Sequence, residues 1–294
     1  MVGKAFVIAA RSWGSWLWGR RYSRSMSKSL WKSRWLLLAL ALIAAACSSA
    51  ADIATTTEVE ESSEEVDAEP AFEVPDTEPD IESDGVGIGR VEIDGTGIDY
   101  IVSVPDGFEL GGEAPLLLAF PPGGQDLQLT TSVARQTYIP EADRLGWVVV
   151  SPAAPDGQRF FDGSESLVPG LLDWVETWVT PEGGAPHVLG PSNGGISSFR
   201  YAVQNPERVQ SVQVYPGFPR GDADRAALTD IADIPIRLYA GETDTVWVEN
   251  AEETLAALID LGADVELTVF PGEGHVPAST RDGTILFEQL ESFR

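Results

Sequence analysis

Positive charge is scarce and unevenly placed in this chain of 294 residues. All three lysines and five of the arginines precede Cys47, in a segment without a single acidic residue. The rest of the chain carries 11 arginines against 46 acidic residues, a net charge of −35. A body this acidic lacks the basic surface that nucleic-acid phosphates require, which excludes nucleic acid as a partner. We interpret the acidity as a solubilising surface rather than a site for a cationic partner.

Cysteine and histidine are nearly absent as well. Cys47 is the only cysteine, so no disulfide can form within the chain. The two histidines, His187 and His275, belong to no cluster with the spacing of metal ligands. No glycine-rich loop before a lysine indicates a phosphate-bearing cofactor. We therefore expect neither a metal nor a cofactor.

The longest apolar run, residues 36–46, is shorter than the ~20 residues that a membrane-spanning helix needs. Basic residues precede it and small residues end it, which is typical of a secretory signal. Ala44-Ala45-Ala46-Cys47 resembles the lipobox of bacterial lipoproteins, with alanine where leucine is usual at Ala44. The resemblance implies cleavage before Cys47, a thioether lipid on it and an extracytoplasmic, membrane-anchored protein. An ordinary signal peptide or a short anchor is the alternative.

The start of this signal segment is itself in question. A chain that begins at Met26 carries a compact signal of ordinary length, so we hypothesise that residues 1–25 are an over-extended start. A twin-arginine signal around Arg20-Arg21 is the alternative, although the apolar core follows it at an unusual distance. N-terminal sequencing of a precursor whose cleavage is blocked decides between the two.

An acidic segment follows the signal. Residues 48–84 hold 14 acidic residues and no basic one, with few side chains that could form a core. Such a segment is expected to stay extended and disordered. The predicted organisation is therefore a lipoprotein signal over 1–46, an acidic tether over 47–85 and a catalytic domain over 86–294.

From Gly85 onward, short strands alternate with helices. Two alternating strands form a predicted hairpin that turns at Asp94-Gly95. Apolar runs predict further strands at 116–120, 147–151, 186–189, 209–214, 234–239 and 265–270, and helical spacing predicts helices at 139–145, 167–180, 196–204 and 248–261. Strands that alternate with helices indicate a parallel sheet covered on both faces. The pattern predicts a single α/β domain.

The motif Gly190-Pro191-Ser192-Asn193-Gly194-Gly195 lies between a predicted strand and a predicted helix. In that context G-x-S-x-G is the nucleophile elbow, a sharp turn that lifts one serine out of the backbone. Glycine two residues to either side lets the strand and the helix approach without a clash of Cβ atoms. Ser192 is therefore the candidate nucleophile.

Ser192 needs a base, and the base needs a carboxylate to orient it. His275 lies in a glycine-rich loop just after the last predicted strand, whereas His187 lies inside a strand and is interpreted as structural. Asp244 follows the strand at 234–239, and Glu242 is a rival acid that lies closer to the strand. Nucleophile-elbow enzymes present their nucleophile, acid and base in the chain order Ser192, Asp244, His275. We predict these three as the catalytic residues.

The body from about Val86 to Arg294 resembles the α/β-hydrolase superfamily. It is most similar to secreted esterases of the polyhydroxybutyrate-depolymerase and feruloyl-esterase kind, and secondarily to dienelactone-hydrolase relatives. The motifs that carry the resemblance are Pro121-Pro-Gly-Gly-Gln-Asp, Gly-Pro-Ser-Asn-Gly-Gly, Gly-Glu-Thr-Asp-Thr-Val and Gly-Glu-Gly-His. It implies an α/β-hydrolase fold and hydrolysis of a small or polymeric ester through an acyl-serine intermediate.

The resemblance also implies an oxyanion hole. One donor is the backbone N–H of the residue after the serine, here Asn193. The second comes from a His-Gly-type loop, which in this chain reads Phe120-Pro-Pro-Gly-Gly-Gln without the histidine. Because proline has no N–H, donation falls to Gly123, Gly124 or Gln125, and we favour Gly124 or Gln125. The alternative is that the two glycines form only a loop turn.

Substrate contacts are expected from a region rather than from individual residues. The segment 159–163 and the positions Tyr215-Pro216 and Trp247 follow predicted strands, so aromatic side chains there are expected near the mouth of the site. A serine peptidase or an acyltransferase on the same triad remains an alternative function. A catalytically silent binding lipoprotein is another, since the donor loop is altered.

Overall fold

The computed structural model describes residues 6–10 and 74–294. The predictions for a start at Met26, for the lipid on Cys47 and for the tether as far as residue 73 lie outside the described residues. No helix in the described ranges combines the length and the hydropathy that crossing a bilayer demands.

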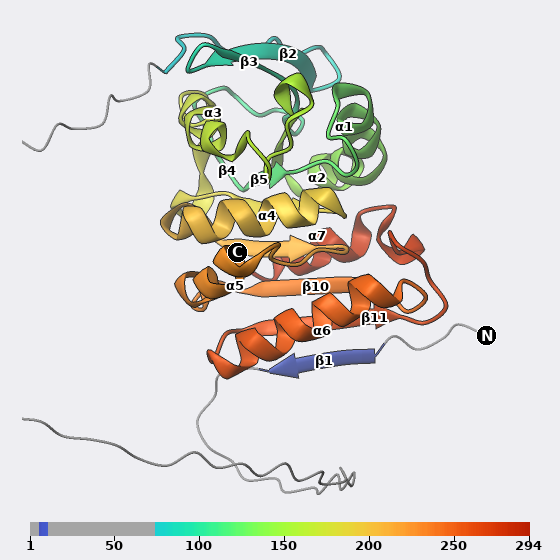
Figure 1. The fold of residues 1–294 in the computed structure, drawn as a ribbon. Helices are drawn as coiled ribbons and strands as arrows, with labels where there is room; N and C mark the ends of the chain where they lie inside the picture. The colour runs from blue at the N-terminus through green and yellow to red at the C-terminus, as the bar shows by residue number, and fades with distance from the viewer. Residues whose placement is uncertain (1–5, 11–73) are drawn as a thin grey trace, which may run out of the picture. The chain divides into compact units, whose positions relative to one another are not determined.

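A nine-stranded sheet forms the centre of the domain (Figure 1). Its strands are β1 (Phe6–Ala10), β2 (Val86–Ile93), β3 (Thr96–Ser103), β5 (Leu116–Ala119), β6 (Val148–Pro152), β8 (His187–Gly190), β9 (Ser211–Val214), β10 (Ile236–Gly241) and β11 (Val265–Phe270). The order across the sheet is β1-β11-β10-β9-β8-β5-β6-β3-β2. The six strands from β6 to β11 in this order pair in parallel, whereas β1, β2 and β3 pair antiparallel at the edges. The prediction of a mainly parallel sheet is confirmed.

This topology gathers the loops that follow the parallel strands. The carboxyl ends of parallel strands share one edge of a sheet, so the loops after β5, β6, β8, β9, β10 and β11 meet there. Both central strands, β5 and β8, are buried along their whole length, as their apolar sequences predict. The predicted catalytic and oxyanion residues all lie in these loops or at the start of the helix that follows β8.

Helices cover both faces of the sheet, as the sequence predicts. They are α1 (Leu127–Val133), α2 (Ile139–Leu145), α3 (Val168–Val175), α4 (Asn193–Gln204), α5 (Asp222–Ala226), α6 (Thr245–Asp260) and α7 (Thr284–Glu291). In Figure 1, α4 and α6 lie in front of the sheet and α7 lies behind it. One apolar cluster joins the sheet to α3, α4 and α6, and a second joins it to α2 and α7. The sheet therefore has an apolar core on each side.

Short elements complete the chain. A π-helix, η1 (Ala134–Tyr138), links α1 to α2, and a two-stranded sheet pairs β4 (Glu113–Ala114) with β7 (Thr180–Pro181). Short 3-10 turns are η2 (Pro155–Gly157), η3 (Glu165–Leu167), η4 (Glu182–Gly184), η5 (Pro206–Arg208), η6 (Ala227–Ile231) and η7 (Ala278–Thr280).

The helix predicted at 167–180 is too long. The regular helix α3 ends at Val175, and the next turn tightens, with Thr177 bonding to the carbonyl of Trp174 and Trp178 to that of Val175. Trp178 and Val179 are buried, and Thr180 already belongs to β7. The apolar residues at helical spacing in this segment therefore belong partly to α3 and partly to the turn that leads into β7.

The domain begins earlier than residue 86. The indole of Trp174 donates a hydrogen bond to the carbonyl of Thr77, Pro79 is buried, and Ile81 packs against the core. The last part of the predicted tether therefore lies against the domain. Strand β1 falls within the predicted signal segment and pairs antiparallel with β11. Signal function stays a prediction.

Candidate active site

The nucleophile elbow joins β8 to α4. Ser192 has φ 56° and ψ −121°, a conformation that residues other than glycine rarely adopt. A Cβ on Gly190 would lie 2.4 Å from the carbonyl carbon of Gly194, and a Cβ on Gly194 would lie 2.2 Å from the carbonyl oxygen of Phe120. Real Cβ atoms do not come this close, so both positions require glycine. The predicted reason for the two flanking glycines is confirmed.

The elbow is also fixed by the loop after β9. The backbone N–H of Ser192 donates to the carbonyl of Pro216 over 2.7 Å. A Cβ on Gly195 would lie 2.5 Å from that same oxygen, so the nucleophile helix packs backbone to backbone against this loop. The strained serine is therefore held from two sides.

The three predicted catalytic side chains form one hydrogen-bonded relay. The Oγ of Ser192 lies 2.8 Å from Nε2 of His275, and Nδ1 of His275 lies 2.5 Å from Oδ2 of Asp244. The His275 side chain is 43% exposed and that of Asp244 20% exposed. The arrangement has a base within reach of the hydroxyl proton and a carboxylate that orients the base. It can activate Ser192 as a nucleophile.

The histidine loop is tied to the end of β10. A Cβ on Gly241 would lie 2.0 Å from the carbonyl oxygen of Gly274, so the two backbones approach each other closely. Thr243 donates from its N–H and from its hydroxyl to the carbonyl of Glu273. The rival acid Glu242 accepts from the N–H of Gly272 over 2.8 Å. Glu242 therefore holds the loop that carries the base, while Asp244 contacts the base itself.

The candidate oxyanion loop follows β5. The N–H of Gln125 already donates to the carbonyl of Pro122 over 3.0 Å, closing a turn. In the described part of the chain, the N–H groups of Gly123, Gly124 and Asn193 donate no hydrogen bond. The side-chain amide of Asn193 donates to the carbonyl of Gly123 over 2.7 Å and joins this loop to the elbow. Of the two favoured donors, Gln125 therefore already uses its N–H within the turn, whereas the N–H of Gly124 does not.

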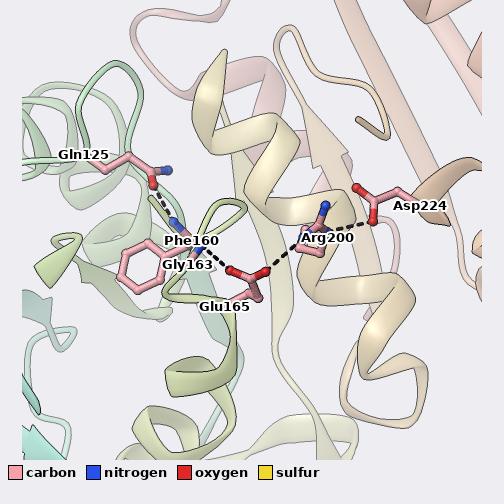
Figure 2. A network of polar contacts seen from close by, with 6 residues as sticks. All are labelled: Gln125, Phe160, Gly163, Glu165, Arg200 and Asp224. Carbon is pink, nitrogen blue, oxygen red and sulfur yellow. Dashed lines mark hydrogen bonds and ion pairs between the residues drawn. The ribbon is translucent and has the colours of Figure 1, made fainter. Parts of the chain in front are cut away.

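The Gln125 side chain has a role that the sequence did not reveal. It is fully buried, and its Nε2 donates to the carbonyl of Pro121 and to the hydroxyl of Ser197, each over 2.9 Å. Its Oε1 accepts from the N–H of Phe160 over 2.9 Å (Figure 2). One amide therefore connects the loop after β5, the nucleophile helix and the loop after β6. No local sequence pattern marks such a residue, because its partners lie far apart in the chain.

An aromatic wall stands beside the base. The ring of Trp247 meets the imidazole of His275 edge-on, with centroids 4.8 Å apart at 71°. Phe218 in turn meets Trp247 edge-on at 4.8 Å. Trp247 was expected near the mouth of the site, and the structure places it there. Tyr215 does not reach the mouth, since it is buried and hydrogen-bonds to the hydroxyl of Tyr138.

His187 is buried in β8, as interpreted from the sequence. Its Nδ1 lies 2.7 Å from the hydroxyl of Ser211, and its ring meets that of Trp147 edge-on. Burial lowers the pKa of His187 to about 4, so the ring is neutral at pH 7. Within residues 6–10 and 74–294, no three histidine, cysteine or acidic side chains are grouped so as to hold a metal ion.

The chain was compared with family models and with proteins of known name. No family model matches the chain. A carboxymethylenebutenolidase of Escherichia coli (strain K12) is 30% identical over 122 residues, which are 38% of this chain and 44% of that protein. The chain thus matches less than half the length of this relative.

Solved structures extend the likeness to the whole domain. A thermostable esterase has a TM-score of 0.58 at 19% identity, covering 71% of this chain and 62% of that one. An S-formylglutathione hydrolase of Agrobacterium tumefaciens has a TM-score of 0.53 at 18% identity, with coverages of 74% and 97%. A dienelactone hydrolase of Anabaena variabilis has a TM-score of 0.52 at 17% identity, with coverages of 71% and 95%. Together with the sheet order, these likenesses show that the chain has the α/β-hydrolase fold.

Proposed function

We propose that this chain is a serine hydrolase that cleaves carboxylic esters through an acyl-serine intermediate. The observation that carries the proposal is the relay Ser192–His275–Asp244, with hydrogen bonds of 2.8 and 2.5 Å at the carboxyl edge of the sheet. The proteins compared above support the choice of ester chemistry through their names. They are named as a thermostable esterase, an S-formylglutathione hydrolase, a dienelactone hydrolase and a carboxymethylenebutenolidase.

In the first half of the reaction, the Oγ of Ser192 attacks the ester carbonyl carbon while Nε2 of His275 takes the hydroxyl proton. The carbonyl π-bond pair moves to oxygen and forms a tetrahedral oxyanion. When that pair returns, the bond to the alkoxy group breaks, and His275 delivers the proton to the leaving alcohol. Asp244 keeps the imidazole in the tautomer that accepts at Nε2 and stabilises the imidazolium.

In the second half, water takes the place of the alcohol. His275 removes a proton from water as its oxygen attacks the acyl carbon, and the second tetrahedral oxyanion forms. Collapse breaks the bond to Oγ, and His275 returns the proton to Ser192. The acid is released and the enzyme is restored without any external reactant besides water.

For the oxyanion, we propose the N–H of Asn193 as one donor and an N–H of the pair Gly123–Gly124 as the other. The support is that the other residues of the loop are eliminated as donors. Pro121 and Pro122 have no N–H, and the N–H of Gln125 already donates within the turn. The bond from the Asn193 side chain to the Gly123 carbonyl holds the two halves of the hole together. Preorganised donors of this kind are worth about 3 kcal/mol each in the transition state.

A fluorophosphonate probe and a short ester test the proposal together. The wild-type chain is expected to be labelled at Ser192 and to hydrolyse 4-nitrophenyl butyrate. Ser192→Ala is expected to lose labelling and to lose turnover by at least about a thousandfold, with an unchanged unfolding temperature. Retained turnover in Ser192→Ala means a different nucleophile. A folded wild type that neither reacts with the probe nor cleaves esters is a binding protein on a hydrolase fold. Cleavage of peptide amides in preference to esters makes it a peptidase.

We also propose that a lipid on Cys47 anchors the chain outside the cytoplasm. The support is the sequence around residues 36–47 alone, with its apolar core and small residues before the cysteine. Labelling of cells with a radioactive fatty acid is expected to mark the wild type and not Cys47→Ser. Equal labelling of both proteins overturns the assignment.

A further inference from the structure

Two arginines beside the candidate site have no acidic partner, although the protein is strongly acidic. Seven of the 11 arginines after Cys47 form ion pairs in the described part of the chain, and they are Arg90, Arg135, Arg144, Arg200, Arg208, Arg237 and Arg294. Arg159 and Arg220 make no ion pair there and no side-chain hydrogen bond. Arg225 and Arg281 form no ion pair either, but Arg225 donates to the amide oxygen of Asn250, and in the described residues neither of them lies over an aromatic ring.

Both arginines cover the same aromatic ring. The guanidinium carbon of Arg159 lies 5.8 Å from the ring centroid of Phe161, and that of Arg220 lies 5.1 Å from it. Phe161 is buried, whereas Arg220 is exposed and Arg159 half-buried. The Nε of Arg159 is buried without a hydrogen-bond partner. Stacking on a ring occupies the face of a guanidinium and leaves its N–H groups, which point outward in the plane, free to bind.

Two acids near these loops pair with a third arginine. Glu165 lies just after the Phe161 loop and Asp224 just after the Arg220 loop, and both pair with Arg200 on α4, over 2.9 and 2.7 Å (Figure 2). Glu165 also accepts from the N–H of Gly163 over 2.7 Å. This network fixes the two loops to the nucleophile helix and pairs Glu165 and Asp224 with Arg200 instead of Arg159 or Arg220. Three acids lie nearer to the two arginines along the chain, and in the described residues none of them forms an ion pair with either arginine: Asp156, Asp162 and Asp222.

The two arginines belong to loops that border the catalytic residues. Arg159 precedes Phe160, whose N–H is bound by Gln125 of the candidate oxyanion loop. Arg220 lies in the loop after β9, where the carbonyl of Pro216 holds the N–H of Ser192. In the sheet, β6 and β9 flank β5 and β8, so their loops meet at the Phe161 ring from either side of the elbow strand.

From this placement we infer that Arg159 and Arg220 form a subsite for a carboxylate, so that the preferred substrate is an ester that also carries a negatively charged group. The inference rests on the proposed esterase function. A guanidinium presents a planar fork of donors that matches a carboxylate, and both charges are held by the same ring. The acidic body repels anions at long range, so two adjacent cations without ion-pair partners offer an anion a local site of attraction.

The experiment compares matched neutral and anionic esters. In the acyl arm, mono-4-nitrophenyl adipate is compared with 4-nitrophenyl hexanoate, which has the same acyl length. In the alcohol arm, 4-(butanoyloxy)benzoate is compared with 4-(butanoyloxy)benzamide, its neutral analogue. The measured quantity is the ratio of kcat/KM for the anionic ester to that for its neutral partner. The two arms show on which side of the ester bond the charge is bound.

The variants are Arg220→Gln, Arg159→Gln and the double variant, with Arg90→Gln as the control. Arg90 is exposed on the edge strand β2, so its replacement removes the same charge away from the Phe161 ring. In one arm, the wild-type ratio is expected to exceed that of each single variant about tenfold, as for one charge-assisted hydrogen bond. The Arg90→Gln ratio is expected to equal that of the wild type. Since Arg220 is exposed, Arg220→Gln keeps the test available even if Arg159→Gln fails to fold.

The outcomes separate the subsite from the esterase function. A protein that hydrolyses the neutral esters through Ser192 but shows equal ratios in wild type, Arg220→Gln and Arg90→Gln has no carboxylate subsite, and the arginines then only cover Phe161. Equal loss in Arg220→Gln and Arg90→Gln reports net charge and also overturns the subsite. A protein without Ser192-dependent hydrolysis of any ester contradicts the proposed function instead.

Discussion

Replacement of Gln125 by alanine is expected to impair both folding stability and turnover. The side chain is fully buried and makes three hydrogen bonds, to the Pro121 carbonyl, the Ser197 hydroxyl and the Phe160 N–H. Alanine leaves the Pro121 carbonyl and the Phe160 N–H without this partner, whereas the Ser197 hydroxyl still donates to the carbonyl of Asn193. The loss also weakens the link between the loop after β5, which carries the proposed oxyanion donors, and the loop after β6, leaving the backbone bond from the Ala154 N–H to the carbonyl of residue 125.

The magnitude follows from the two groups that lose their partner. A buried polar group left without a partner costs about 1–3 kcal/mol, so the variant is expected to lose roughly 3–5 kcal/mol of unfolding free energy. Native domains are stable by about 5–15 kcal/mol, so most of the protein still folds at room temperature. For a domain of this size the unfolding temperature is expected to fall by roughly 10 °C. A displaced oxyanion loop costs less than a deleted donor, which is worth about 10²–10³ in kcat, so we expect a decrease in kcat of about tenfold.

Gln213 provides a matched control for this substitution. It is also fully buried, but its amide makes one hydrogen bond, over 3.3 Å to the carbonyl of Leu286, and its Oε1 has no partner in the described residues. Gln213→Ala is expected to cost much less stability and to leave kcat for 4-nitrophenyl butyrate unchanged. Thermal unfolding followed by circular dichroism and initial rates at 15 °C measure both effects. Equal unfolding temperatures for the two variants, or an unchanged kcat in Gln125→Ala, would refute the role assigned to Gln125.

Two further predictions concern the chain's histidines. Trp247→Ala removes the edge-on contact with His275 and is expected to lower kcat/KM for 4-nitrophenyl butyrate about twofold to tenfold, whereas Trp247→Phe is expected to stay closer to wild type. If Trp247→Ala keeps both the rate and the pH–rate profile of the wild type, the contact does not position the base. The depressed pKa of His187, about 4 against an ordinary 6.5, means that the unfolded chain binds this proton more readily, so stability is complete above pH 6.5 and decreases as the pH falls toward 4. Urea unfolding at pH 7.5 and at pH 5 measures this effect. Between these two pH values, the free energy of unfolding of His187→Gln is expected to decrease by about 2 kcal/mol less than that of the wild type. Equal decreases in the two proteins would contradict burial of a neutral ring.

The elbow and the relay could be predicted because each depends on a pattern along the chain. Glycines at 190 and 194 report a close approach that any elbow requires, and the structure shows both contacts. Asp244 and His275 follow successive strands, and parallel strands bring their carboxyl ends to one edge. Chain order and strand order together were enough to place three side chains within hydrogen-bonding distance.

Other features depend on contacts that no local pattern encodes. The role of the Gln125 side chain depends on groups at positions 121, 160 and 197, and the turn that engages its N–H depends on backbone angles with φ 62° at that residue. Glu242 was interpreted as a rival acid because distance along the chain is the only measure that the sequence provides. Its actual partner, the Gly272 N–H, is reached across the gap between two loops.

The proposed catalytic residues are positioned by close backbone approaches, whereas the proposed carboxylate subsite consists of side chains. Gly194 against Phe120, Gly195 against Pro216 and Gly241 against Gly274 each exclude even a methyl group. The first two approaches join the segments after β5, β8 and β9, and the third joins the end of β10 to the loop after β11. Contacts of this kind tolerate no side chain, so they fix the positions of nucleophile and base for any substrate. The side chains of Phe161 and Arg220, in contrast, meet through a ring and a guanidinium and take no part in these backbone approaches. Side-chain contacts of that kind can change without moving Ser192. We therefore expect substitutions of the Phe161 and Arg220 side chains to change substrate preference while Ser192 keeps its position.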